Sequence, residues 1–168
     1  MSDVIVGCDP TRVDTVAAFT PGTESAHPDT INFPGTKLRY IKAAAAIAAG
    51  DSLILKTDEA LEPHALIPSS AVQQPIVGIA PVAIASGSFG WIVRHGRVAS
   101  AKAAASTAAG ARLGSSATAG TLTTLTQADS NFTSNDYFEL LAYAQSPVIA
   151  LDANDSNGLP IEVFIGQG

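Results

Sequence analysis

Short apolar runs separated by small-residue turns dominate the middle of this chain. Val77-Gly78-Ile79-Ala80 and Trp91-Ile92-Val93 are two such runs, and Ser86-Gly87-Ser88 lies between them. Short runs that are rich in β-branched residues and bounded by Gly, Pro and Ser are typical of strands. The pattern predicts a mainly β protein whose body is a small β-barrel or sandwich (jelly-roll-like), with at most one or two short helices.

Residues 1–36 differ from this pattern, because they hold four of the ten prolines and little apolar periodicity. Pro-spaced segments tend to stay extended, so the sequence predicts an extended N-terminal arm that becomes ordered on a partner. The alternative is an edge strand and a long loop of the same domain. Ordering costs about 1–2 kcal/mol per residue, so an arm needs apolar anchors. The candidate anchors are Val4, Ile5, Phe19, Ile31 and Phe33.

The β-rich body, residues 37–168, carries a loose internal repeat of small-residue turns. Ala48-Ala49-Gly50 leads into one apolar run, and Ala108-Ala109-Gly110 leads into another. We therefore expect two duplicated units, 37–100 and 101–168, that pack as a small barrel or sandwich.

Two alanine tracts allow either helical or extended structure. Alanine favours helices, but neither Ala43–Ala49 nor Ala101–Ala111 has an amphipathic face. We expect extended structure in the first tract and a loop or short helix in the second. The clearest helix candidate is Ser134–Ala144, because Ser134 can cap its start and Asp136 favours its first turn.

Charge is sparse along the 168 residues. Only 14% of them are charged, with a net charge of −6, and globular proteins average about 25% charged residues. An exterior with so few charges is typical of an oligomer or of a protein docked on a larger surface. The alternative is an alanine-rich domain, since alanine raises hydropathy without requiring burial.

The two signs of charge are separated along the chain. Residues 63–128 contain four bases and no acid, whereas residues 113–168 contain six acids and no base. Arg94, Arg97 and Arg112 are therefore candidates for charge pairing between protomers. The alternatives are pairing within one fold, or simple solvation. Four bases without interleaved aromatic residues do not predict a nucleic-acid surface.

No group of residues along the chain predicts catalysis. His27, His64 and His95 are far apart and lack metal-ligand spacing, and Cys8 has no neighbouring base. The sequence contains no Gly-x-Ser-x-Gly elbow, P-loop or Gly-x-Gly-x-x-Gly motif. We expect no enzyme activity, no catalytic, cofactor-binding or metal-binding residues, and no cofactor.

The segment 152–158 resembles a calcium loop, because oxygen-bearing residues alternate before a glycine. Its register is wrong: with Asp152 first, the glycine comes one place late and Val163 stands where a bidentate glutamate is needed. Asn157-Gly158 between two apolar runs instead favours a hairpin turn.

The uncharged stretch 65–93 predicts buried strands rather than a membrane span, because Pro68, Pro75 and Pro81 interrupt it.

Trp91 is the only tryptophan. We expect it to be a core anchor that buries about 150–250 Å², and the alternative is an exposed interface anchor. The N-terminus lacks a basic and apolar leader, so we expect synthesis in the cytoplasm.

These residues also carry a family resemblance. The run from Lys37 to Ala43, the Ala49-Gly50-Asp51 turn, Val77–Ala80, Gly87–Val93 and Ala109-Gly110 resemble small virion proteins of tailed bacteriophages, the capsid decoration (cement) proteins and related head proteins. The resemblance covers residues 37–165. It implies a β-rich body, usually a homotrimer, on the outer capsid surface where major-capsid subunits meet, made in the bacterial host cytoplasm and stabilising the expanded shell.

The partners implied are the major capsid protein and further copies of the chain, with no nucleic acid and no membrane. The Pro-rich arm fits this role, since such proteins often extend a terminal segment over neighbouring capsomers. Deletion of residues 1–36 is expected to leave a folded body that binds shells more weakly. The alternatives are another virion component, such as a head-fibre base or tail protein, and a free-standing ligand-binding β domain.

Overall fold

The computed structural model describes residues 4–6, 8–26, 36–56, 64–70, 75–125, 148–153 and 160–166. Strands are the only regular elements in these ranges, which confirms the predicted mainly β, barrel-like body. The strands are β1 (Val4–Val6), β2 (Val13–Asp14), β3 (Glu24–Ala26), β4 (Lys37–Ala43), β5 (Ser52–Leu55), β6 (Ala65–Pro68), β7 (Gly78–Ile79), β8 (Phe89–Ala101), β9 (Arg112–Ser115), β10 (Leu122–Thr124), β11 (Val148–Ala150) and β12 (Ile161–Ile165).

Five strands close into a ring, which we call the first barrel. β4 pairs with β6, β6 with β5, β5 with β7, β7 with β8, and β8 again with β4. Closure leaves no free edge within the ring. One cluster of buried side chains fills it, namely Ile41, Ala43, Ile47, Leu53, Leu66, Ala80, Ile84 and Ile92.

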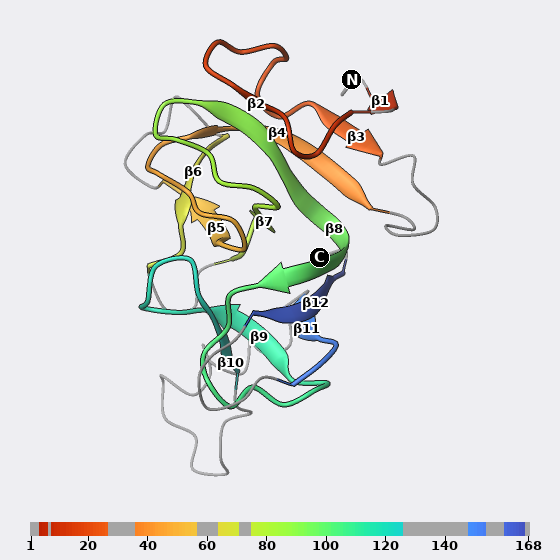
Figure 1. The fold of residues 1–168 in the computed structure, drawn as a ribbon, viewed down its shortest axis with the longest axis vertical. Coiled ribbons are helices and arrows are strands. Elements are labelled where there is room, and N and C mark those ends of the chain that lie inside the picture. The colour runs from red at the N-terminus through yellow and green to blue at the C-terminus, as the bar shows by residue number, and fades with distance from the viewer. Residues whose placement is uncertain are drawn as a thin grey trace.

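The second half of β8 begins a second ring, which we call the second barrel. β8 pairs with β12, β12 with β11, β11 with β9, and β9 with β10. A parallel bridge between Ala103 and Leu122 closes the ring just after β8 ends. Figure 1 shows β8 running from the upper part of the molecule, with β4–β7, to the lower part, with β9–β12.

The two barrels use the same pairing scheme, strand for strand. The parallel pair β4–β6 corresponds to the parallel bridge between Ala103 and Leu122. The antiparallel pairs of β5 with β6 and β7 correspond to those of β9 with β10 and β11. The pairs β7–β8 and β4–β8 correspond to β11–β12 and β8–β12. The long strand β8 thus ends one unit and begins the next.

The Ala-Ala-Gly turns occupy the same place in both barrels. Gly50 N donates to Ala80 O at 2.8 Å, and Gly110 N donates to Ala150 O at 2.9 Å. Both glycines are left-handed, with φ of +81° and +80°, a region that favours glycine. In the first alanine tract only Ala43 belongs to a strand, and a bend at residues 44–45, a bridge at Ile47 and a turn at residues 49–50 follow it, so the predicted extended structure holds only in part. The second tract forms a loop with turns after Ala101. The helix predicted at 134–144 and the turn at Asn157-Gly158 lie outside the described residues.

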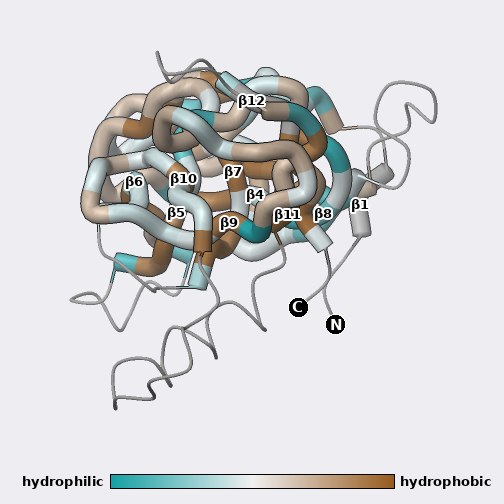
Figure 2. Tube along the Cα trace, turned by 90° about the horizontal axis from the view of Figure 1, so that it is seen from below, coloured by the Kyte–Doolittle hydropathy of each residue, from teal (hydrophilic) through white to brown (hydrophobic). Residues whose placement is uncertain are grey.

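Hydrophobic stretches gather in the middle of the molecule, around β4, β7 and β9 (Figure 2). A second buried cluster fills the second barrel and extends over the outer side of β4 and β8, where Tyr40 and Trp91 are cross-strand partners. Cys8 and Phe19 pack against this cluster from the N-terminal segment. The N-terminal strands join the sheet as well, since β1 pairs with β3, β3 with β4 and β2 with β8.

These pairings place residues 8–26 on the body of their own chain, which is the edge-strand arrangement considered as the alternative to an arm. Each pairing supplies backbone hydrogen bonds that an extended arm would otherwise leave to water or to a partner. The binding of residues 1–36 to a partner stays a prediction.

Candidate functional site

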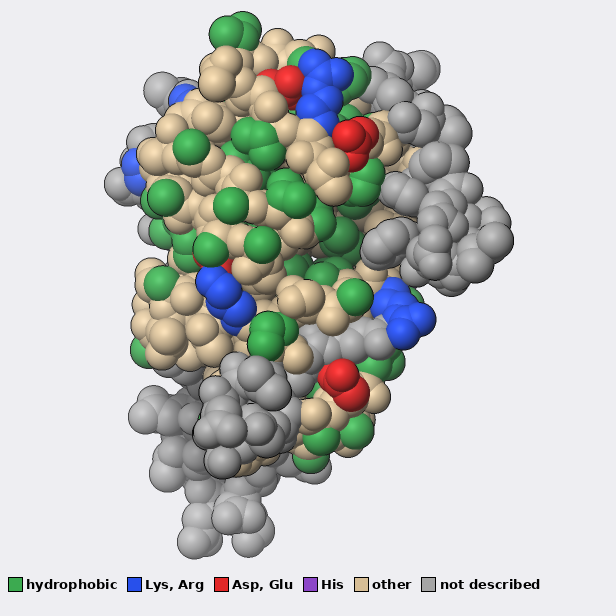
Figure 3. Space-filling view, viewed as in Figure 1, with side chains coloured by type: hydrophobic (Ala, Val, Ile, Leu, Met, Phe, Trp, Pro, Cys, Tyr) green, Lys and Arg blue, Asp and Glu red, His purple; other side chains and the backbone are tan. Residues whose placement is uncertain are grey.

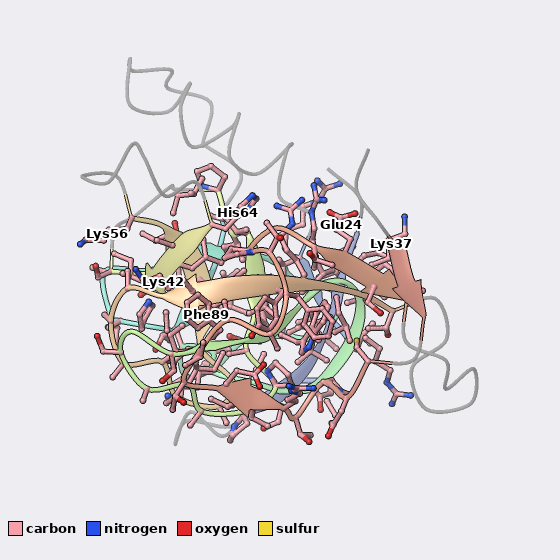
Figure 4. All side chains as sticks on the ribbon, turned by 90° about the horizontal axis from the view of Figure 1, so that it is seen from above. Glu24, Lys37, Lys42, Lys56, His64 and Phe89 are labelled. Atoms are coloured by element: carbon pink, nitrogen blue, oxygen red, sulfur yellow. The ribbon has the colours of Figure 1, made fainter. Side chains whose placement is uncertain are left out.

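An aromatic cluster anchors the N-terminal segment to the first barrel. The Phe19 ring lies 5.3 Å from that of Tyr40 and 5.4 Å from that of Trp91, centroid to centroid. Phe89, opposite Lys42 in the register and labelled in Figure 4, stacks on Tyr40 at 6.1 Å. Trp91 is fully buried. Trp91 is therefore a core anchor. The Phe19 ring packs against the body of its own chain.

Tyr40 also binds this segment through polar contacts. Its hydroxyl donates to Asp14 Oδ2 at 2.7 Å and accepts from the backbone N of Ala18 at 3.2 Å. Burial and the hydrogen bond to Asp14 raise the pKa of Tyr40 to about 12. The same hydrogen bond, followed by the one from Arg12, lowers the pKa of Asp14 below its usual value. The neutral phenol and the ionised carboxylate therefore stabilise each other.

Arg94 belongs to a charged cluster within the chain. The Glu24 carboxylate accepts hydrogen bonds from Arg94 and, at 2.7 Å, from Arg39. The Arg39 hydrogen bond is the main cause that lowers the pKa of Glu24. Figure 4 places Glu24 beside β4, near the strand end that carries Lys37. Arg94, which was predicted to pair between protomers, thus has an acidic partner in its own chain.

A junction of backbone and side-chain contacts joins the two barrels. Lys102 N donates to Gly50 O at 3.0 Å, and Ser52 N donates to Gly120 O at 2.8 Å. The buried Asp51 carboxylate accepts from Lys102 Nζ at 2.6 Å and from Ala48 N at 2.7 Å. Sequence reasoning missed this pair, because its two members lie 51 residues apart. The sequence offers one signal for this pair, namely that Asp51 follows the first Ala-Ala-Gly turn whereas Ala111 follows the second.

Arg97 and Arg112 lie at the two ends of an outward-facing row on the second barrel. The row crosses β9, β11, β12 and β8, because Arg112 is opposite Ile149, Ile149 is opposite Phe164, and Phe164 is opposite Arg97. Residues directly opposite each other in a sheet share a face. We call these four residues the β9–β8 row.

The middle of the β9–β8 row is apolar and exposed. Ile149 is 38% exposed and Phe164 is 37% exposed, while Arg97 is exposed and Arg112 half-buried. The neighbours along each strand point the other way and are buried: Leu113, Val148, Ala150, Val163, Ile165 and Val98. The His95 ring lies 5.5 Å from that of Phe164, edge to face. A rigid sheet therefore presents two large apolar side chains to solvent between two cations.

Other candidate residues lie elsewhere. Val4 and Ile5 belong to β1, and Ile31 and Phe33 lie outside the described residues. Two further exposed apolar side chains, Val13 and Val16, lie on the N-terminal segment, and Val16 is 79% exposed. In the view of Figure 3, Lys and Arg side chains form separate spots rather than one basic patch.

The described ranges hold no group of three His, Cys, Asp or Glu side chains that could bind a metal ion, and no helix long and apolar enough to cross a membrane. Burial lowers the pKa of His64, and it raises the pKa of the Cys8 thiol despite a hydrogen bond with Ser25. A raised thiol pKa reduces the thiolate fraction at neutral pH.

Comparison with solved structures finds a structural likeness. No family model matches the chain, and no curated protein matches it. The structure is similar to the crystal structure of the head fibre gp8.5 N base in bacteriophage phi29, at a TM-score of 0.47 and 13% identity. The match covers 77% of this chain and 92% of that chain.

Proposed function

We propose that this chain is a structural component of a bacteriophage head that binds the outside of the shell where major-capsid subunits meet. The resemblance to decoration proteins rests on Gly-Ala motifs, and these motifs are the turns that build both barrels. Gly50 and Gly110 each lie two residues before the equivalent strands β5 and β9, and Gly87 precedes β8 with φ of +80°. The resemblance thus concerns residues that determine the fold.

The observation that carries the proposal is the exposed apolar middle of the β9–β8 row on a closed barrel. Apolar side chains that protrude from a rigid sheet between cations suit a docking surface, because binding buries them without ordering a loop. A protein that clamps a shell needs such a surface in many copies. If the chain forms a trimer, three contacts of moderate strength would raise avidity by about 10²–10⁴ over a single contact.

The test is the copy number of the chain in purified particles, measured by quantitative mass spectrometry against the major shell protein. We expect hundreds of copies in a simple ratio to the shell protein. A handful of copies would favour the alternative, a head-fibre base or tail protein. Complete absence would contradict both virion functions and favour a free-standing binding domain. Light scattering of the purified chain tests the proposed homotrimer.

A further inference from the structure

We infer that the junction of the two barrels holds an internal water molecule, bound by the hydroxyls of Ser52 and Ser69. Both side chains are fully buried, at 0% exposure. Neither hydroxyl has a hydrogen-bond partner among the described residues. Buried hydroxyls in proteins are almost always hydrogen-bonded to protein or to water, because an unpartnered one is unfavourable. The two serines therefore need a small ligand that can both donate and accept.

The two serines face each other across strands β5 and β6. Ser69 N donates to Ser52 O at 2.8 Å, one step beyond the paired residues Leu53 and Pro68. Residues opposite each other in a sheet share a face. Leu53 belongs to the cluster inside the first barrel, and successive side chains of a strand alternate in direction. The two hydroxyls thus lie together on the outer side of the first barrel.

Gly120, which lies between β9 and β10, closes this face from the second barrel. Ser52 N donates to Gly120 O, and Gly120 N donates to Ser69 O, both at 2.8 Å. With the bond from Ser69 to Ser52, the three residues form a closed ring of backbone hydrogen bonds. Each N–H group of the ring already has its acceptor, whereas each carbonyl oxygen can accept a second hydrogen bond. A water molecule can accept from the hydroxyls and donate to a carbonyl, which gives it the roughly two to four partners of an internal water.

The second barrel shows that the pair of serines is specific to the junction. Leu125 N donates to Arg112 O at 2.9 Å, as Ser69 N does to Ser52 O. Since β9 and β10 correspond to β5 and β6, the second barrel has two large side chains where the first has two serines. Small side chains leave room for a water molecule. Alanine, which is abundant in this chain, would also fit there, but only serine supplies a hydroxyl to hold the water.

The charges at the junction favour a neutral ligand over a cation. The Asp51 carboxylate packs against the same glycine, since a Cβ at Gly120 would overlap Asp51 Oδ1. This carboxylate already accepts from Lys102 Nζ at 2.6 Å and from Ala48 N at 2.7 Å. Its charge is therefore paired, and a cation placed beside it would be repelled by the lysine ammonium.

Magnetic relaxation dispersion of water oxygen tests the inference on the purified full-length chain, independently of the proposed function. It counts internal waters that exchange slowly with solvent. Ser52→Ala combined with Ser69→Ala is expected to lower that count by about one. Ser25→Ala is the matched control, because Ser25 is also buried but is hydrogen-bonded with Cys8. The control is expected to leave the count unchanged. An unchanged count in the double variant would overturn the inference.

A high-resolution crystal structure of the unmodified chain is the second measurement, and it needs no variant. We expect an ordered water within hydrogen-bond distance of both serine hydroxyls. A direct hydrogen bond between the two hydroxyls, with no water beside them, would contradict the inference. A sodium ion at the same oxygens, recognised by contacts shorter than those of water, would contradict it as well.

Discussion

The Asp51 carboxylate and the Lys102 ammonium form an ion pair of 2.6 Å across the junction of the two barrels. The aspartate side chain is only 6% exposed, whereas that of the lysine is 42% exposed. Asp51 also accepts a hydrogen bond from Ala48 N at 2.7 Å, inside the Ala-Ala-Gly turn. One carboxylate therefore holds a turn of the first barrel and a residue at the start of the second.

The asymmetry of this pair predicts unequal effects of its two members. Asp51→Ala is expected to lower the free energy of unfolding by about 1–2 kcal/mol, because the Ala48 N–H loses its acceptor. Lys102→Met should cost more, about 2–3 kcal/mol, because it leaves the buried Asp51 carboxylate without a counter-charge, whereas the lysine left by Asp51→Ala can be solvated. Urea unfolding of both variants measures the difference. An equal cost for the two changes would contradict this division of roles.

Gly120 packs directly on the same carboxylate. A Cβ at Gly120 would overlap Asp51 Oδ1, and the residue has φ of +73°. Gly87 has a similar φ of +80°, but a Cβ there meets nothing within 4 Å. Gly87→Ala should therefore cost about 1–2 kcal/mol from backbone strain alone, and Gly120→Ala clearly more. Denaturant midpoints of the matched pair test this, and equal midpoints would argue against the packing at Asp51.

The Tyr40–Asp14 hydrogen bond predicts how stability depends on pH. The folded pKa of Asp14 lies below its unfolded value, so its stabilisation is present above that value and is lost as pH falls through the folded pKa. The pKa of Tyr40 is raised to about 12, so its contribution is present below pH 10 and is lost between about pH 10 and 12.

Tyr40→Phe keeps the ring and removes the Tyr40 contribution and the larger part of the Asp14 contribution, since Arg12 still binds Asp14. It is expected to flatten the loss of stability at both pH extremes and to lower stability at neutral pH by about 1 kcal/mol. Thermal unfolding of the two proteins at a series of pH values provides the measurement. If the stability of both proteins changed with pH in the same way, the Tyr40–Asp14 hydrogen bond would not be the cause of the pH dependence.

The packing of Phe19 predicts how much the N-terminal segment contributes to the stability of the body. The ring is half-buried against Tyr40 and Trp91, so Phe19→Ala should cost roughly 1–3 kcal/mol, less than for a fully buried phenylalanine. Trp91 fluorescence should shift to longer wavelength as water reaches the indole. Val16→Ala, on the same segment and 79% exposed, should change neither quantity. An unshifted Trp91 spectrum in Phe19→Ala would place Phe19 away from the core.

Some features of this protein follow from the sequence alone. Alternating apolar runs and glycine-marked turns predicted the strands, because strand period and left-handed turns depend on neighbouring residues only. The Ala-Ala-Gly motif, which occurs twice in the sequence, marks the equivalent turn of each barrel. Trp91 was expected in the core, and the fully buried ring agrees with that expectation.

Tertiary structure alone decided which distant residues meet. Arg97, Phe164, Ile149 and Arg112 come from four strands and become one row only when the second barrel closes. Asp51 and Lys102 likewise meet because two rings share β8. Local patterns determine which way each side chain points along a strand, but the register between strands depends on the packing of both barrels at once.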